Sequence, residues 1–468
     1  MTKPPGKTVS AIQSNLAMSA SSESPRSESG VGALMTWADR LWAITYLSHG
    51  AETGSDVGLY EIDENFEMRK HPESRDGTFA NRMIHPHSDQ LIIGPHVVDV
   101  HRNVRTFDTL LRDDEGKPNR LTATMEHLEN PEELAYFLTM EGLLYEANVH
   151  TLEVEKLFDL AEELALDGGS QHAHFKGGWT SNGRVVVTNN TYDENEYAGR
   201  RSDGRLAEWT GPGADWTILE EKPFMDVAGR KNMGEVIFAN GWDAASAILS
   251  VFADGEWKRY RLPKASHTYD HAWTTEWTRI REVEHERFLM DCHGAFYELA
   301  PFAYDGAVWG VKPICSHARV VPDYCTYRGY LVLGGDQATP SGDTNLLAGQ
   351  PQSNLVFGKI DDLWSYGKPA GWGGPWREDR IEAGVPSDPF LMTGFDKKVL
   401  HLSHDAPDPV SFEIEVDFLG DGAWHVYESI AVESGGYEHH EFPDGFSAHW
   451  VRLTADADCE ATAHFTYT

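Results

Sequence analysis

The feature that most constrains this chain is a repeated unit of two short apolar strands joined by a tight turn. The unit recurs at intervals of roughly 40–50 residues, which is the spacing of β-propeller blades or solenoid repeats. About seven units lie between residues 41 and 360 and include LWAITYLSHG, QLIIGPHVVDVHRNVRTF, RVVVTNNTYDEN, RFLMDCHGAFYELA and GYLVLGGD. The repeat therefore predicts an all-β fold, a seven-bladed β-propeller.

A second β-rich segment follows the repeats. The stretch GKPAGWGGPW is dense in glycine and proline and indicates an irregular connection. Beyond it, apolar and polar residues alternate at strand length between turns such as GDG and SGG, which predicts a C-terminal β-sandwich. We expect a flexible lead or peripheral strand at 1–34, the propeller at 35–385 and the sandwich at 386–468.

The charge balance limits the partners of the protein. Lys and Arg number 39 against 74 Asp and Glu, so the net charge is -35 and nucleic acid is repelled at long range. An acidic ligand must then be held by a local basic pocket. No apolar run approaches a membrane span, and the first 34 residues lack the apolar core of a secretory signal. We therefore expect no membrane partner and favour a cytoplasmic over a secreted location.

The four cysteines form no CxxC pair and are too few for a disulfide scaffold. We expect buried free thiols, with pairing of Cys315 and Cys325 as the alternative in an oxidising compartment.

Histidines are the main candidates for chemistry, because the chain has no Walker loop, GxGxxG fingerprint, HExxH pair or GxSxG elbow. A propeller brings the start of each blade's inner strand to the central channel, where such groups converge. Imidazoles suit proton transfer near neutral pH. The competing interpretation is that each histidine caps its blade. The set comprises His85, His87, His127, His172, His174, His271, His293 and His317.

Two histidine pairs also have the spacing of metal ligands. His172 and His174 are alternate residues of a predicted strand and would point to the same face, and His85 and His87 have the same spacing. A divalent metal, calcium or zinc, in the central channel is therefore a candidate cofactor. Structural or water-bridged roles are the alternatives.

Cations and aromatic residues surround the histidines in the sequence. Indole rings pack on the apolar faces of sugars, and guanidinium groups pair with carboxylates. The combination favours an acidic oligosaccharide or polysaccharide, with blade-to-blade packing as the alternative role of each tryptophan. The residues concerned are Arg82, Lys176, Trp179, Arg205, Arg230, Lys231, Trp242, Trp273, Trp277, Arg279 and Tyr324.

This residue set is compatible with β-elimination at a 4-linked uronate. The C5 proton can be removed once a cation neutralises the carboxylate, and a histidine or tyrosine can act as the base. Paired carboxylates at the channel would instead indicate hydrolysis. No pair of acidic residues stands out in the sequence.

Several segments resemble one known family. NRMIHPHSDQLIIGPHVVD, HFKGGWTSNGRVVVTNN, FLMDCHGAFYEL, QSNLVFGKIDDL and SDPFLMTGFDKKVLHLSHD are similar to propellers related to L-rhamnose-α-1,4-D-glucuronate lyases (polysaccharide lyase family 42) and to α-L-rhamnosidase-like propellers. The resemblance runs from about Met35 to the C-terminus. It implies axial histidines that are assisted by a tyrosine and an arginine.

The resemblance implies a lyase that cleaves a sugar, rhamnose in the related enzymes, from O4 of a glucuronate. A glycoside hydrolase on the same propeller and a non-catalytic glycan-binding propeller are the alternatives. The expected catalytic residues are His85, His174 and Tyr145. The expected substrate-binding residues are Arg82, His87, His127, His172, Lys176, Trp179, Trp273, His293 and Tyr324.

Overall fold

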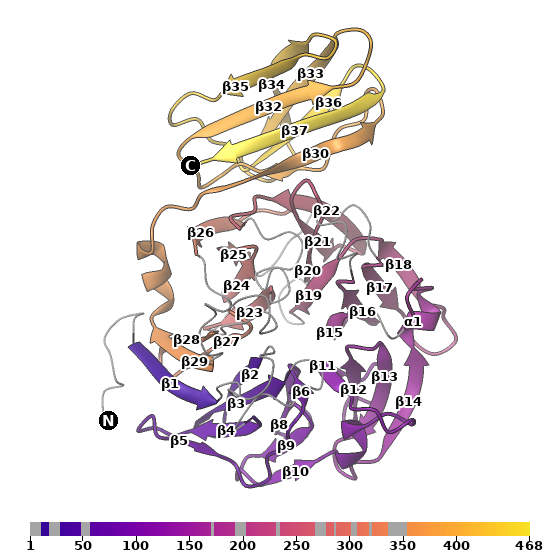
Figure 1. The fold of residues 1–468 in the computed structure, drawn as a ribbon, viewed down its shortest axis with the longest axis vertical. Coiled ribbons are helices and arrows are strands. Elements are labelled where there is room, and N and C mark those ends of the chain that lie inside the picture. The colour runs from indigo at the N-terminus through magenta and orange to yellow at the C-terminus, as the bar shows by residue number, and fades with distance from the viewer. Residues whose placement is uncertain are drawn as a thin grey trace, which may run out of the picture.

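The computed structural model describes residues 11–17, 29–47, 57–169, 173–191, 203–230, 235–266, 278–284, 287–300, 307–317, 321–335 and 353–468. Within these residues, seven antiparallel sheets are arranged radially around an axis, and a two-sheet sandwich lies beside them (Figure 1). The predicted all-β fold, a seven-bladed β-propeller with a C-terminal β-sandwich, is confirmed.

Each blade is a four-stranded meander. Blade one contains β2 (Ser29–Trp37), β3 (Arg40–Leu47), β4 (Leu59–Ile62) and β5 (Met68–Lys70), and blade two contains β7 (Arg82–His85), β8 (Gln90–Ile93), β9 (His96–Asp99) and β10 (Val104–Thr106). Blade three contains β11 (Arg120–Glu126), β12 (Leu134–Thr139), β13 (Leu143–Asn148) and β14 (Val154–Asp159), and the short strand β6 (Thr78–Phe79) pairs with β11. Blades four and five contain β15 (Phe175–Ser181), β16 (Arg184–Asn189), β17 (Arg205–Trp209) and β18 (Thr217–Glu220), then β19 (Phe224–Gly229), β20 (Ile237–Trp242), β21 (Ala247–Ala253) and β22 (Glu256–Leu262). Blade six contains β23 (Arg279–Val283), β24 (Arg287–Cys292), β25 (Ala295–Leu299) and β26 (Lys312–Ser316).

The seventh blade closes the ring with strands from both ends of the propeller sequence. It contains β27 (Tyr324–Tyr327), β28 (Tyr330–Gly335) and β29 (Ser353–Gly358), and β1 (Ala11–Ala17) pairs with β29 as its outer strand. The first strand of every other blade is its innermost strand, and β27 takes that place here. The lead of the chain therefore contributes a peripheral strand, as one of the two expectations had it.

Apolar side chains fill the spaces between neighbouring blades. In one cluster, Trp42 and Ile44 of β3 meet Leu91 and Val97 of the second blade and Phe137 of the third. All five are buried. Such packing holds the blades at fixed angles and leaves the edges of the inner strands around the axis. Short helices occur at η1 (Asp108–Leu111), α1 (Leu160–Glu163) and η2 (Ile360–Ser365).

The C-terminal sandwich has two sheets around its own apolar core. One sheet has the order β30 (Gly371–Ile381), β37 (Cys459–Tyr467), β32 (Lys398–His404) and β35 (Tyr437–Glu441). The other contains β31 (Phe390–Leu391), β36 (Trp450–Ala455), β33 (Val410–Asp417) and β34 (Trp424–Val432), and it continues into the fifth blade because β31 also pairs with β22. The sandwich and the propeller therefore share one eight-stranded sheet.

Both expected domain boundaries differ from the structure. The first blade begins with β2 at Ser29, inside the expected lead, and the sandwich begins with β30 at Gly371, before the expected boundary at 385/386. Both strands are rich in glycine for a steric reason. A Cβ on Gly32 would lie 1.8 Å from the Phe79 carbonyl oxygen, and one on Gly374 would lie 1.9 Å from that of Ala463. Glycines that allow this close backbone approach interrupt the apolar pattern from which a strand is predicted in the sequence.

The remaining global expectations concern cysteines and membrane spans. All four cysteines are buried and free, so the disulfide alternative for Cys315 and Cys325 is wrong. None of the helices in the described part of the chain has the length and apolar character of a membrane span.

Candidate functional site

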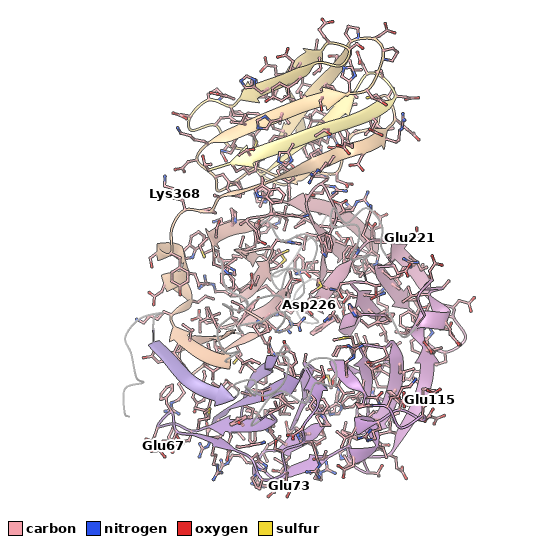
Figure 2. All side chains as sticks on the ribbon, viewed as in Figure 1. Glu67, Glu73, Glu115, Glu221, Asp226 and Lys368 are labelled. Atoms are coloured by element: carbon pink, nitrogen blue, oxygen red, sulfur yellow. The ribbon has the colours of Figure 1, made fainter. Side chains whose placement is uncertain are left out.

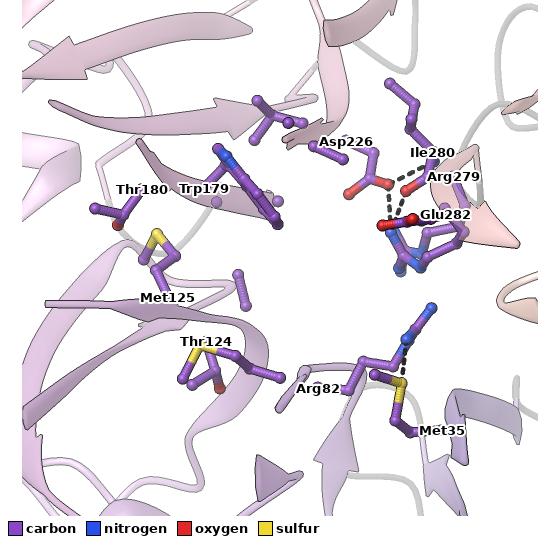
Figure 3. A pocket seen from close by; sticks show the side chains of 18 of the residues that line it. Met35, Arg82, Thr124, Met125, Trp179, Thr180, Asp226, Arg279, Ile280 and Glu282 are labelled. Carbon is purple, nitrogen blue, oxygen red and sulfur yellow. Dashed lines mark hydrogen bonds and ion pairs between the residues drawn. The ribbon is translucent and has the colours of Figure 1, made fainter. Parts of the chain in front are cut away.

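A cavity of about 550 Å³ lies on the propeller axis. Its wall comes from the inner strands, which follow one another around the axis in the order β2, β7, β11, β15, β19, β23 and β27. Figure 3 shows Trp179, Thr180, Thr124 and Met125 on one side of this channel. Arg82, Asp226, Arg279 and Glu282 lie on the other side, so one wall is aromatic and apolar and the opposite wall is ionic.

A chain of ion pairs crosses the ionic wall. Asp323 directly precedes β27, and its carboxylate lies 2.8 Å from Arg82 Nε and 2.7 Å from Arg281 Nε. Arg281 reaches the next carboxylate as well, because its Nη1 lies 2.7 Å from Asp226 Oδ2. Four residues in or next to the inner strands of four blades are thereby connected in the order Arg82, Asp323, Arg281 and Asp226.

The two carboxylates also bind the backbone of neighbouring inner strands. Leu34 N donates to Asp323 Oδ2 at 2.7 Å, and Ile280 N donates to Asp226 Oδ2 at 2.8 Å. Each aspartate thus joins its own blade to the edge of another. Burial alone would raise the pKa of Asp323, but the Arg82, Arg281 and Arg279 guanidinium groups lower it below its ordinary value.

Cationic side chains gather at one level of the channel. Arg82, Lys176, Arg279 and Arg281 line the cavity there, and Asp226 and Asp323 are the carboxylates that pair with Arg82 and Arg281. Acidic groups also lie at the periphery, and Figure 2 shows Glu67, Glu73, Glu115 and Glu221 at the outer edge of the ring. This end of the channel, which we call the basic mouth, therefore brings cations together in a protein of net charge -35.

The other end of the channel is acidic. Glu126 is the last residue of β11, Glu282 lies late in β23 and Glu284 follows that strand, and all three line the cavity. Glu282 pairs with Arg230 at 3.2 Å. Because the blades repeat around one axis, their inner strands run in the same direction, so the beginnings of the strands form one mouth and their ends form the other.

The expected catalytic histidines lie at opposite mouths. His174 directly precedes β15 and its N–H donates to Asn189 Oδ1 at 3.0 Å, whereas His85 is the last residue of β7. His85 is fully buried, and its Nδ1 lies 2.7 Å from Ser88 Oγ. Burial lowers the pKa of His85. A strand rises about 3.3 Å per residue, so these two imidazoles are too far apart to serve as acid and base at one bond.

Several residues expected at the channel do not line it. His127 follows β11, where its Nε2 lies 3.1 Å from Glu146 Oε2 and its Nδ1 accepts from Asn130 N at 3.0 Å. Its ring stacks on Tyr136 with centroids 4.4 Å apart. These contacts match the competing interpretation, in which a histidine caps its blade.

The remaining misplaced residues are buried between strands or exposed in turns. Tyr145 lies on β13, two strands away from the axis, and burial raises its pKa. Tyr324 O–H donates to the Arg279 carbonyl at 2.8 Å between blades. His293 is buried in the turn between β24 and β25, and His87 is exposed in the turn after β7. The expectation that these side chains converge on the channel is therefore wrong.

Three of the expected substrate-binding residues do line the channel, namely Arg82, Lys176 and Trp179, and so does Arg279 from the wider set of cations and aromatic residues. His172 and Trp273, together with His271, Trp277 and Lys231, lie outside the described residues. The ion-pair residues Asp226, Asp323 and Arg281 were not among the candidates. The signal for them was a charged residue at or near the beginning of an apolar strand, in FMDVAG, RIREV and PDYCTY.

The described residues offer no ready cage for the candidate metal. Nowhere in the described ranges do three or more histidine, cysteine or acidic side chains converge in a way that could hold an ion. The two channel aspartates direct their oxygens to Arg82 and Arg281. One member of the His172 and His174 pair lies outside the described residues.

The comparisons with known proteins inform only the fold. No family model and no curated protein matches the sequence. Among solved structures, the chain is similar to the RRP9 WD40 repeats, with 9% identity, a TM-score of 0.41 and coverage of 73% of this chain and 99% of that one. It is also similar to PorZ of Porphyromonas gingivalis (11% identity, TM-score 0.42, coverage 86% and 46%) and to the extracellular domain of the putative hybrid two component system BT3049 from B. thetaiotaomicron (8%, 0.45, coverage 94% and 55%).

Proposed function

We propose that the axial channel binds the carboxylate of a uronate-containing carbohydrate and that the protein is a polysaccharide or oligosaccharide lyase. The observation that carries this proposal is the pair of facing walls, with Arg82 and Arg279 opposite the indole of Trp179. Arg281 lines the same cavity. A uronate has a flat apolar face that packs on an indole and a carboxylate that pairs with guanidinium groups. In a protein of net charge -35, such a local group of arginines suits an anionic ligand.

The proposed reaction is β-elimination at the uronate. A base removes the C5 proton, the electron pair of that bond forms the C4–C5 double bond, and the oxygen at C4 leaves with its sugar and takes up a proton. Neutralisation of the carboxylate by the arginines makes the C5 proton removable. By the family resemblance, the uronate is glucuronate and the leaving sugar is rhamnose.

His174 is the proposed proton-transfer residue at the basic mouth. It directly precedes β15, and Lys176, two residues further, lines the channel. His85 lies at the other mouth and is not assigned to this step. Its buried ring and its contact with Ser88 suit a structural role.

A glycoside hydrolase is the second candidate, and the glutamates of the acidic end favour it. Glu126, Glu282 and Glu284 line the same channel. Hydrolysis uses two carboxyl groups, one as acid and the other as base or nucleophile. In that case the sugar would be cleaved near the ends of β11 and β23.

One experiment separates these activities. The full-length protein is incubated with a panel of uronate-containing oligosaccharides, and the products are followed by ultraviolet absorbance and mass spectrometry. A lyase gives an unsaturated uronate that absorbs in the ultraviolet and adds no water to the products. Products heavier by one water would establish hydrolysis instead, and binding without turnover would leave a glycan-binding propeller.

The arginine wall can be tested in the same assay. Replacing Arg82 with Ala should weaken binding of the acidic oligosaccharide by roughly 10- to 100-fold, since charge-assisted hydrogen bonds contribute about 1.5–3 kcal/mol. Arg40→Ala is the control, because Arg40 forms an ion pair with the exposed Glu64 away from the cavity. Equal affinities for the parent protein and Arg82→Ala would place the ligand elsewhere.

A further inference from the structure

A row of aromatic rings crosses the outer face of the sandwich sheet that contains β30, β37, β32 and β35. His401 on β32 lies directly opposite His439 on β35 and His464 on β37. The ring centroids of His464 and Trp372 are 6.1 Å apart, and those of His401 and Tyr437 are 6.0 Å apart. Both pairs have planes within 21° of parallel, and we call these five residues the aromatic row.

Hydrogen bonds fix the middle of the row. His401 Nδ1 lies 2.7 Å from Tyr437 Oη. Burial lowers the pKa of His401, and it lowers the pKa of His464 to about 4. These two imidazoles are therefore neutral near pH 7 and keep both a donor and an acceptor. The side chain of Tyr437 remains 57% exposed.

The rest of this face is polar and weakly charged. Strand alternation and burial place Ser403, Thr462 and Thr466 outward beside the row, with Val399 as the aliphatic member of β32 and β37 on that side. Glu441 and Glu460 lie on the same side. Such a face has too little aliphatic surface for a hydrophobic protein contact, and its carboxylates disfavour polyanions. Rings that carry polar atoms next to hydroxyl groups match the mixed apolar and polar faces of neutral sugars.

The aromatic row ends at the propeller. Trp372 exchanges two backbone hydrogen bonds with Lys264, each of 2.8 Å, and Lys264 Nζ lies 6.0 Å from the Trp372 ring centroid. Lys264 follows β22, the outer strand of the fifth blade, in the connection to β23, so it lies on the face of the ring where the inner strands begin and the basic mouth opens. Figure 1 shows the sandwich beside this part of the ring, next to β22. One carbohydrate chain could thus reach both places.

We propose that the aromatic row is a second carbohydrate site, which binds neutral sugar residues of the chain whose acidic residue enters the channel. The choice of carbohydrate as ligand rests on the proposed function. The row adds affinity through a part of the chain remote from the channel, because two linked sites on one molecule bind with a raised effective concentration.

Titration calorimetry with the full-length protein tests this inference. The probes are neutral oligosaccharides of galactose, arabinose and rhamnose, and the same chains with a terminal glucuronate. We expect Tyr437→Ala and His401→Ala each to weaken binding of the neutral probes by roughly two- to tenfold, the effect of losing one stacked ring. Val426→Ala is the control, because Val426 is 61% exposed on β34 of the other sheet and should leave binding unchanged.

The outcomes separate this inference from the proposed function. Neutral probes that bind Tyr437→Ala more weakly than the parent protein support the aromatic row, even if no uronate is bound or cleaved. Neutral probes that bind the parent protein and Tyr437→Ala equally, or that bind neither, overturn the row. Loss of glucuronate binding in Arg82→Ala with neutral binding retained would show that the two sites are separate.

Discussion

Asp323 is the residue on which the geometry of the channel depends most. It is fully buried, and its carboxylate contacts Arg82, Arg281 and the backbone N–H of Leu34. Replacing it with Asn keeps the shape but leaves Arg82 without a carboxylate. Removing one partner of a buried ion pair costs about 3–5 kcal/mol, so we expect the free energy of unfolding to fall by that amount. Denaturant unfolding measures it.

A surface ion pair provides the comparison for Asp323. Asp361 contacts Arg287, but its side chain is 77% exposed. Exposed pairs contribute about 0–1 kcal/mol, so Asp361→Asn should change stability little. If Asp323→Asn behaves like Asp361→Asn, the ion-pair chain does not stabilise the ring.

His96 should make stability depend on pH. Burial first of all, together with the charges of Arg75 and His71, lowers its pKa from 6.5 to about 3. In the unfolded chain the imidazole takes up a proton below about pH 6.5, whereas the folded one stays neutral until about pH 3. The contribution of His96 is therefore complete above pH 6.5 and is lost as the pH falls from 6.5 toward 3.

The expected slope for His96 is about 1.4 kcal/mol per pH unit within that window. Replacing His96 with Gln should flatten the fall in unfolding free energy between pH 6.5 and 5 by about 2 kcal/mol, measured by urea denaturation at both pH values. His101→Gln is the control, because His101 is exposed in the turn after β9. An unchanged slope in His96→Gln would contradict the neutral buried state.

Residue types were easier to predict from the sequence than their positions around the axis. Arg82, Lys176 and Trp179 were expected at the channel and line it. His127 and His85 were also expected there, but they occupy the ends of inner strands and the turns that follow. A repeat of two strands and a turn does not say which strand is innermost. The same histidine spacing thus fits a channel mouth or a capped turn.

The ion-pair chain could not be predicted because its members are far apart in the sequence. Arg82 and Asp323 lie in the second and seventh blades and are adjacent only because the ring closes. The seventh blade likewise includes β1, which pairs with β29 across more than 300 residues. Local patterns contain no information about such pairings.

Strand β1 should be required for a stable ring. Without it, β29 becomes an exposed edge with unpaired backbone groups, which favours aggregation. Removing residues 1–17 should therefore lower the melting temperature and increase light scattering on heating. Removing residues 1–9 is the control, since it leaves β1 intact. Equal melting temperatures for the two truncations would show that the seventh blade is stable with three strands.

The sandwich and the propeller should unfold together. Asp388 Oδ2 accepts from Arg259 Nε and Arg261 Nε, each at 2.8 Å, and Arg261 also binds Asp243. Trp450, on β36 of the sandwich, donates its Nε1–H to the carbonyl of Val308 in the propeller at 2.8 Å. Like the shared sheet, these contacts give buried polar groups of the propeller and of the sandwich hydrogen-bond partners that each part would lack without the other. The aromatic row is consequently held in a fixed position beside the outer edge of the fifth blade.

The net charge of -35 affects the whole molecule and the channel in opposite ways. Like charges repel across the surface, and the Debye length falls from about 10 Å at 0.1 M salt to about 3 Å at 1 M. The melting temperature should therefore rise with added sodium chloride.

The same screening by salt removes the long-range repulsion between the protein and an anionic oligosaccharide, but it also weakens the attraction of the oligosaccharide to Arg82 and Arg281. We expect both its association rate and its dissociation rate to rise with salt, measured by stopped-flow tryptophan fluorescence. A melting temperature that is flat or falls with salt would contradict the surface-charge explanation, and a falling association rate would mean that the basic mouth already dominates the field at long range.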